Sequence, residues 1–263
     1  MIAILFVLVD VIGPIGLVLL FLYKNKETRD LIGPRLLYAG LIAFILFPLF
    51  LPRKHIEGWL IKQNSDFLFV TFVVQMHNNL YEELAKLVSL ILAVIMLEEK
   101  GRKAISSFRG ALYLGYALGL FYGVGEAVTL TLIAKNPSLY RIFGVNLFLL
   151  FINFRWLWER FLALQMHGIM GGLVGIGYHY LRKKDRWKFL LFFLIAILYH
   201  ELVDGLIIYI GYNAGRPLAK FLLSNLFSVV LPAEVVIGYV ILAILARKGG
   251  KNVEFSADNP YGS

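Results

Sequence analysis

The chain contains no cysteine among its 263 residues, which excludes disulfides, thiol catalysis and cysteine-ligated zinc. Charged residues are also scarce, at 16%, whereas 59% of the residues are hydrophobic and the mean hydropathy is +0.75. A soluble domain this apolar could not cover its surface with polar side chains. The composition therefore predicts an all-α polytopic membrane protein rather than a soluble enzyme.

Two further absences narrow the chemistry. No serine lies in a Gly-x-Ser-x-Gly or Gly-x-Ser-Gly setting, so a rhomboid-like serine mechanism lacks its nucleophile. Asp10 and Asp204 are the only candidates for an intramembrane aspartyl pair, and neither lies in a Gly-x-Gly-Asp motif. A presenilin-like dyad is therefore not indicated.

Long apolar runs predict about seven transmembrane helices. They cover residues 2–23, 36–51, 67–97, 110–133, 158–180, 188–211 and 218–246. We expect one transmembrane domain over 1–248, with a core of catalytic type at 67–211, and a disordered cytoplasmic tail at 249–263. Residues 142–154 are interpreted as an interfacial or re-entrant segment. No Lys or Arg occurs in the first ten residues, so we expect a retained anchor rather than a cleaved signal peptide.

The net charge of +9 is explained by topology rather than by nucleic-acid binding. One set of alternate loops carries 16 Lys and Arg, in 24–35, 98–109, 181–188 and 247–251, and the other set carries 9, in 52–66, 134–160 and 212–220. The positive-inside rule then places the N-terminus outside and the C-terminus in the cytoplasm. We expect a multi-pass protein of the plasma membrane, with the lipid bilayer and no nucleic acid among its partners.

Four predicted spans carry ionisable residues where lipid is expected. The residues are Glu82, Glu83, Glu126, His167, His200 and Asp204. Charges at membrane depth are costly and usually mark a functional site. Counting 1.5 Å per residue from alternating ends puts all six between the midplane and the outer third of the bilayer. We therefore expect them to meet around one cavity.

Local pairs offer a simpler explanation for some of these residues. Lys86 lies within pairing distance of Glu82 or Glu83, and His200 shares a helix face with Asp204. A Glu–Lys pair would explain one of the two glutamates, and a His200–Asp204 pair would explain the histidine. The other glutamate would still lack a partner. The string His200-Glu201-Leu202-Val203-Asp204 fails the zinc motif HExxH, because Asp204 replaces its second histidine. Glu234, in the last span, is an accessory acid or a partner for Lys86.

These residues, in this order on successive spans, resemble a known family. Glu82-Glu83-x-x-Lys86, Phe121-x4-Glu126, Arg160-x6-His167 and His200-x3-Asp204 are similar to motifs of the PrsW and CAAX-type (CPBP, YhfC-like) intramembrane proteases. The anterior-pharynx-defective subunit of γ-secretase is distantly similar. The resemblance covers residues 78–210, and the chain departs from the pattern at Ala127 and Gly171.

The resemblance implies an intramembrane protease of glutamate or metallo type that acts on a membrane protein or peptide. Glu82 would be the water-activating base with Glu83 in support, His167 and His200 would orient water or bind metal, and Asp204 would support His200. Glu126, His167 and His200 make a set suited to catalytic Zn²⁺ with an open position.

Two rivals use the same residues: a secondary transporter or proton-coupled channel, and a non-catalytic scaffold that binds a partner transmembrane protein. A transporter should show two pseudo-symmetric halves, which the sequence does not reveal. The depth of the six residues, and a water path past 77–79, favour cleavage at the extracytoplasmic side.

Overall fold

The computed structural model describes residues 2–135 and 154–257, which form helices and no strand. The chain runs through α1 (Ile2–Phe6), η1 (Val7–Ile12), α2 (Gly13–Lys24), η2 (Arg29–Leu31), α3 (Pro34–Phe50), α4 (Arg53–Gln63), α5 (Phe67–Phe69), η3 (Val70–Gln75), α6 (Met76–Met96), α7 (Glu98–Ser106), α8 (Phe108–Lys135), α10 (Phe154–Arg182), α11 (Arg186–Tyr212), α12 (Pro217–Asn225), η4 (Leu226–Val230) and α13 (Leu231–Ala257). The predicted all-α membrane fold is confirmed.

Six helices of the described residues are long and apolar enough to cross a membrane. Each corresponds to a predicted span, and the predicted span 67–97 is not among them. That segment is helical from Phe67 to Met96, but Glu82, Glu83 and Lys86 interrupt its hydrophobicity. The predicted number of seven spans and their orientation therefore stay predictions.

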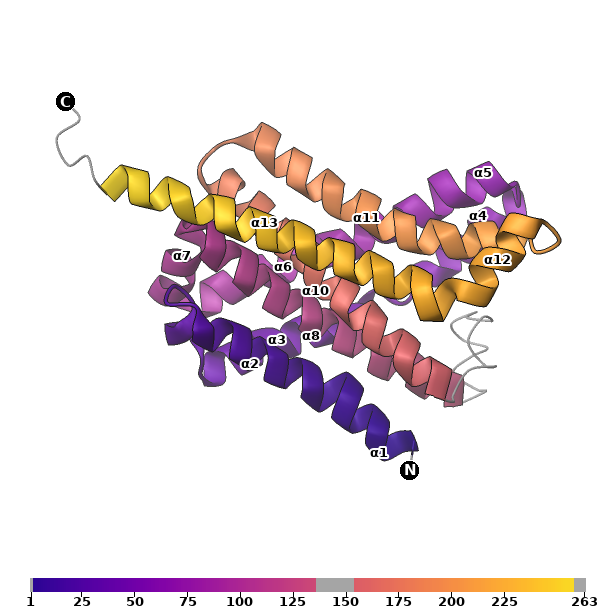
Figure 1. Ribbon diagram of the computed structural model, residues 1–263, viewed down its shortest axis with the longest axis horizontal. Coiled ribbons are helices and arrows are strands. Elements are labelled where there is room, and N and C mark those ends of the chain that lie inside the picture. Colours follow the sequence, from indigo (N-terminus) through magenta and orange to yellow (C-terminus); the bar gives the residue numbers. More distant parts are fainter. Residues whose placement is uncertain (1, 136–153, 258–263) are drawn as a thin grey trace.

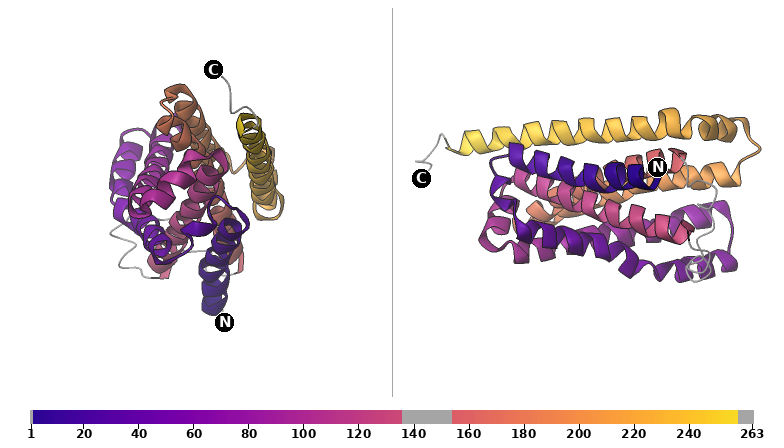
Figure 2. Two further views of the ribbon diagram at one scale, coloured as in Figure 1. Left: turned by 90° about the vertical axis from the view of Figure 1, so that its left-hand side faces the viewer. Right: turned by 90° about the horizontal axis from the view of Figure 1, so that it is seen from below.

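The helices run along the long axis of the molecule and turn back at two ends (Figures 1 and 2). One end carries α7, the connection between α10 and α11, and the C-terminal end of α13. The opposite end carries α1, α4, α5 and α12 (Figure 1). The loops predicted to be cytoplasmic therefore lie together at one end, as alternating topology requires.

Helices α8 and α10 form the centre of the bundle, and glycines bring their backbones into contact. A Cβ on Gly119 would lie 2.2 Å from the His167 carbonyl oxygen, and one on Gly115 would lie 2.3 Å from the Gly171 carbonyl oxygen. Small residues permit this close approach between membrane helices. The contact places His167 of α10 directly beside the last turns of α8, which carry Glu126.

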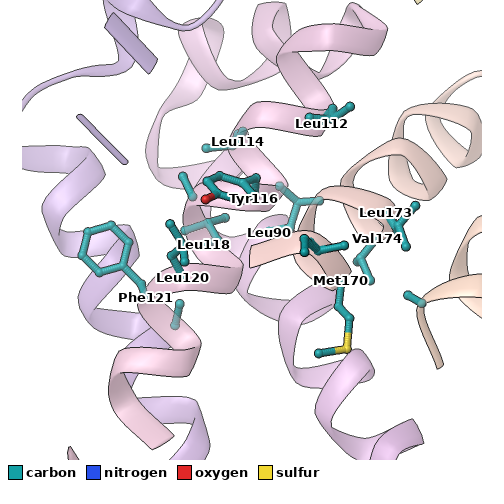
Figure 3. Packing of buried hydrophobic residues seen from close by; sticks show 14 of the residues in the cluster. Leu90, Leu112, Leu114, Tyr116, Leu118, Leu120, Phe121, Met170, Leu173 and Val174 are labelled. Carbon is teal, nitrogen blue, oxygen red and sulfur yellow. The ribbon is translucent and has the colours of Figure 1, made fainter. Parts of the chain in front are cut away.

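Large apolar side chains surround this glycine contact on both sides. Figure 3 shows Leu112, Leu114, Leu118 and Leu120 of α8 near Met170, Leu173 and Val174 of α10, all of them buried. The outer helices differ, because Leu190, Leu194 and Leu198 of α11 are exposed, as lipid-facing residues of a membrane helix are. The two central helices thus form a rigid platform for the polar residues.

Two segments that the sequence analysis assigned to a loop and to a tail contain helix. Residues 53–63, assigned to an extracytoplasmic loop, form helix α4, which follows α3 almost directly and buries Arg53 and Glu57. Helix α13 continues to Ala257, so residues 249–257 of the predicted disordered tail are helical. The end of α13 is anchored on α8, where Arg109 donates to the Ala246 carbonyl oxygen at 2.8 Å. The predicted segment 142–154 lies outside the described residues except for Phe154, which begins α10.

Replacing Gly119 with alanine tests the central contact. We expect Gly119→Ala to force α8 and α10 apart and to lower the free energy of unfolding by about 1–3 kcal/mol. Gly16→Ala is the matched control, since a Cβ on that glycine in helix α2 meets nothing within 4 Å. Thermal unfolding in detergent measures both, and equal stability of the two variants would contradict the packing.

Topology is tested with single cysteines on the cysteine-free chain. Ser65 and Ser106 are both exposed and lie at opposite ends of the bundle. We expect Ser65→Cys to react with an impermeant thiol reagent added to intact cells, and Ser106→Cys to react only after lysis. The reverse pattern would invert the predicted orientation.

Candidate functional site

One face of helix α6 supplies most of the polar residues of the site. Asn79, Glu82, Glu83 and Lys86 occupy positions i, i+3, i+4 and i+7, so they lie on one side of the helix. All four side chains are buried, and the neighbouring Leu80 and Leu84 point outward and are exposed. The helix therefore turns its charged face into the bundle and its apolar face away from it.

Glu82 is bound by an arginine that the sequence analysis did not identify. Arg53 of α4 forms a short ion pair with Glu82 Oε1 and donates to the Asn78 side-chain oxygen at 2.9 Å and to the Phe50 carbonyl oxygen at 3.0 Å. Its guanidinium also lies over the Phe47 ring, 5.5 Å from the centroid. The arginine is thus fixed on several sides, and it occupies only one oxygen of Glu82.

Glu126 of α8 is held in a similar way by two residues of α10. Arg160 donates to Glu126 Oε1 at 3.0 Å, and His167 Nε2 contacts Glu126 Oε2 in a short hydrogen bond. Arg160 and His167 are seven residues apart, which is two turns along one helix face. The motif Arg160-x6-His167 therefore clamps one carboxylate between a guanidinium and an imidazole.

Glu83 joins Lys86 and His200 in a third group. Lys86 donates to Glu83 Oε1 at 2.5 Å, and His200 Nδ1 lies 2.9 Å from the same oxygen. An ionised carboxylate only accepts, so the imidazole donates from Nδ1 and exchanges protons through Nε2. That Nε2 lies 3.4 Å from Asp204 Oδ2 and 3.8 Å from Glu82 Oε2.

The three groups meet at one point. Donor atoms of Glu82, Glu126 and His167 all lie within 4.8 Å of one another, and the rings of His167 and His200 are perpendicular with centroids 5.5 Å apart. The structure therefore brings together the six predicted residues from α6, α8, α10 and α11, which we call the Glu/His cluster. Their catalytic roles stay predictions.

The group suited to a metal ion differs from the predicted one. Glu82, Glu126 and His167 form it, whereas His200 is not a member. Two carboxylates and one imidazole fit zinc and also harder divalent cations. Glu126 Oε2 and His167 Nε2 are hydrogen-bonded to each other, so a bound ion would replace that hydrogen bond.

A second polar layer connects the cluster to the outside. Gln75 donates to Asp204 Oδ2 at 2.6 Å, and Asn79 donates to Glu201 Oε2 at 2.8 Å. The Asp204 side chain is 28% exposed, whereas those of Glu82 and Glu83 are 6% and 0% exposed. Asp204 is therefore the most exposed member of the cluster.

Other residues from the sequence analysis have simpler positions. Lys86 pairs with Glu83, so Glu234 is not its partner. Glu201 accepts from Asn79 instead of facing the metal group. Arg53 was missed because it follows Pro52 at the end of an apolar run, where a basic residue normally indicates a headgroup contact.

Comparison of the chain with protein-family models, with curated proteins and with solved structures found no match in any of the three.

A double-mutant cycle tests the Arg53–Glu82 pair. We expect Arg53→Met to cost about 3–5 kcal/mol of stability, because it leaves a buried carboxylate without its cation. Arg53→Met combined with Glu82→Met should cost less than Arg53→Met alone, since no unpaired charge then remains.

Arg35→Met is the matched control for this cycle. Arg35 also pairs with a glutamate, Glu98, at 2.7 Å, but the two side chains are 59% and 64% exposed. An exposed pair contributes at most about 1 kcal/mol. Equally small losses in Arg35→Met and Arg53→Met, measured by unfolding in detergent, would contradict the buried pair.

Proposed function

We propose that this protein is an intramembrane endopeptidase that hydrolyses a peptide bond of a membrane-associated substrate. The observation that carries the proposal is the convergence of two arginine-bound carboxylates and a histidine within 4.8 Å, beside a second histidine. Groups at this spacing can hold and polarise one water molecule. The resemblance to PrsW and CAAX-type proteases supports the same reaction.

Glu82 acts as the base in this proposal. Its Oε1 is bound by Arg53, and its Oε2 is directed toward the space shared with His200. Glu82 Oε2 takes a proton from water while the water oxygen attacks the scissile carbonyl carbon. The carbon–nitrogen bond then breaks, and the proton passes to the departing amine, so that one water yields one carboxyl and one amino terminus.

The histidines serve the proton movements and the developing charge. Glu83 accepts from His200 Nδ1, so His200 Nε2, 3.8 Å from Glu82 Oε2, takes the proton from Glu82 and passes it to the leaving amine. His167 Nε2 already contacts Glu126, so a protonated His167 donates from Nδ1, which has no partner among the described residues, to the oxygen of the tetrahedral intermediate. Asp204, next to His200 Nε2, holds that imidazole in place.

A divalent cation has a place in the same site. Glu82, Glu126 and His167 would hold it, and zinc is the cation that the sequence predicts. Such an ion supplies Lewis-acid polarisation and lowers the pKa of a bound water to about 7. With the predicted orientation, the exposed side of Asp204 faces outward, so cleavage falls at the extracytoplasmic side of the substrate.

Glutamate-to-glutamine substitutions test the reaction. We expect Glu82→Gln to lower proteolysis at least about 10²-fold, the usual effect of losing a general base. Glu98→Gln makes the same chemical change at an exposed position and should retain full activity. Wild type and variants are reconstituted with a pool of membrane proteins, and new termini are detected by mass spectrometry.

The outcomes of this assay separate the alternatives. Full activity in both Glu82→Gln and Glu83→Gln would remove the glutamate base from the mechanism. Peptide binding without cleavage by the wild type would favour the scaffold. Elemental analysis of the same samples tests the metal: bound ion that is lost in Glu126→Gln supports the metallo type, and an ion-free active enzyme supports the glutamate type.

A further inference from the structure

Buried polar atoms without a hydrogen-bond partner among the described residues include two outside the Glu/His cluster, one on α10 and one on α13. These two atoms are Gln165 Nε2 and Glu234 Oε2, respectively. The two residues are 3% and 8% exposed. A buried polar group without a partner is destabilising, so such an atom needs an explanation, for example a bound ligand or an ordered water.

The register of the two helices places these residues opposite each other. Helices α10 and α13 run in the same direction (Figure 1), and Gly238 meets Ile169 between them, its Cβ position 2.6 Å from Ile169 Cδ1. Gln165 lies four residues before Ile169, and Glu234 lies four residues before Gly238. Both residues therefore lie one helical turn before the Gly238–Ile169 contact, Gln165 on α10 and Glu234 on α13.

Other polar atoms of Gln165 and Glu234 form hydrogen bonds with neighbouring tyrosines, and these bonds fix the orientation of the two residues. Gln165 Oε1 accepts a short hydrogen bond from Tyr239, whose hydroxyl is 2.6 Å from that of Tyr116. Tyr199 donates to the Glu234 carbonyl oxygen at 2.8 Å. The amide of Gln165 thus presents a donor, and the carboxyl of Glu234 presents an acceptor, between α10 and α13.

Gln165 and Glu234 lie close to residues of the Glu/His cluster. Tyr199, which binds the Glu234 backbone, is adjacent in sequence to His200, and Asp204 lies within electrostatic range of Glu234. Helix α13 is joined to α11 here by this hydrogen bond, and its Val236, Ile237 and Val240 are exposed. Glu234 on α13, and Gln165, which is hydrogen-bonded to Tyr239 of α13, therefore lie on the side of the cluster that faces α13.

We propose that Gln165 and Glu234 form a binding subsite for the unwound backbone of the substrate's transmembrane segment. The subsite rests on the proposed proteolytic function. A helix cannot present a peptide bond for attack until it unwinds, and unwound N–H and C=O groups need partners inside the membrane. One donor and one acceptor facing each other supply those partners: Gln165 Nε2 donates to a substrate carbonyl, and Glu234 Oε2 accepts from a substrate N–H.

Binding of paired peptides to the Glu82→Gln protein tests this subsite without cleavage. Two fluorescent transmembrane peptides of equal length are compared, one with a central Gly-Pro that unwinds easily and one with Leu-Ala in its place. We expect the Gly-Pro peptide to bind more tightly. Gln165→Glu keeps the size but removes the donor, and Glu234→Leu removes the acceptor; each should weaken Gly-Pro binding about 5- to 30-fold.

Three further variants make the comparison specific. Glu234→Gln keeps an acceptor oxygen and should bind the Gly-Pro peptide within about threefold of the parent protein. Gln63→Glu and Glu99→Leu repeat the two changes at exposed positions and should have no effect. Thermal unfolding verifies folding, and Gln165→Met, which also lacks a donor, replaces Gln165→Glu if the latter does not fold.

The failure of the subsite is distinguishable from the failure of the proposed function. Equal binding of the two peptides, or unchanged Gly-Pro binding in both Gln165→Glu and Glu234→Leu, would overturn the subsite and assign the two atoms to a buried water. Cleavage by the wild type with either result would leave the proteolytic function intact. Selective Gly-Pro binding without any cleavage would retain the subsite in a protein that binds its partner and does not cut it.

Discussion

Every deeply buried carboxylate of the Glu/His cluster is paired with a cation. Glu82 pairs with Arg53, Glu83 with Lys86 and Glu126 with Arg160, which is shared with Glu159. Ionised groups cannot remain unpaired in a medium of low polarity. The positions of α4, α6, α8 and α10 depend on this pairing, because each pair except Glu83–Lys86 joins two different helices.

The pairing also leaves the carboxylates available for chemistry. Arg53 and Arg160 each bind the Oε1 atom of their glutamate, and the two Oε2 atoms turn toward the histidines. The charge pairing and the geometry suited to water activation are therefore consequences of one arrangement.

The sequence was sufficient to predict the convergence of Glu82, Glu126, His167 and His200, because depth along successive spans follows from a fixed rise per residue. It was not sufficient to predict the role of Arg53. A basic residue after Pro52 gives the same sequence pattern whether its side chain contacts lipid headgroups or pairs with a buried glutamate. Two members of the metal group, Glu126 and His167, were predicted, whereas the third is Glu82 and not His200, because side-chain direction decides between them and does not follow from sequence spacing. The glycines of α8 and α10 were recognised as a packing stripe, and their mutual contact required coordinates.

The charges of α6 have a consequence for how the protein enters the membrane. Glu82, Glu83 and Lys86 would each cost about 2.5–3.5 kcal/mol at the centre of an isolated inserting helix, on the scale measured for charged residues. Arg53 precedes α6 in the chain and Lys86 is part of it, so both glutamates of α6 find their cations as soon as the helix is synthesised. Glu126 must wait for Arg160 and His167, which follow it in the chain. We therefore expect α8 to enter the membrane stably only together with α10, after α6 has found its cations.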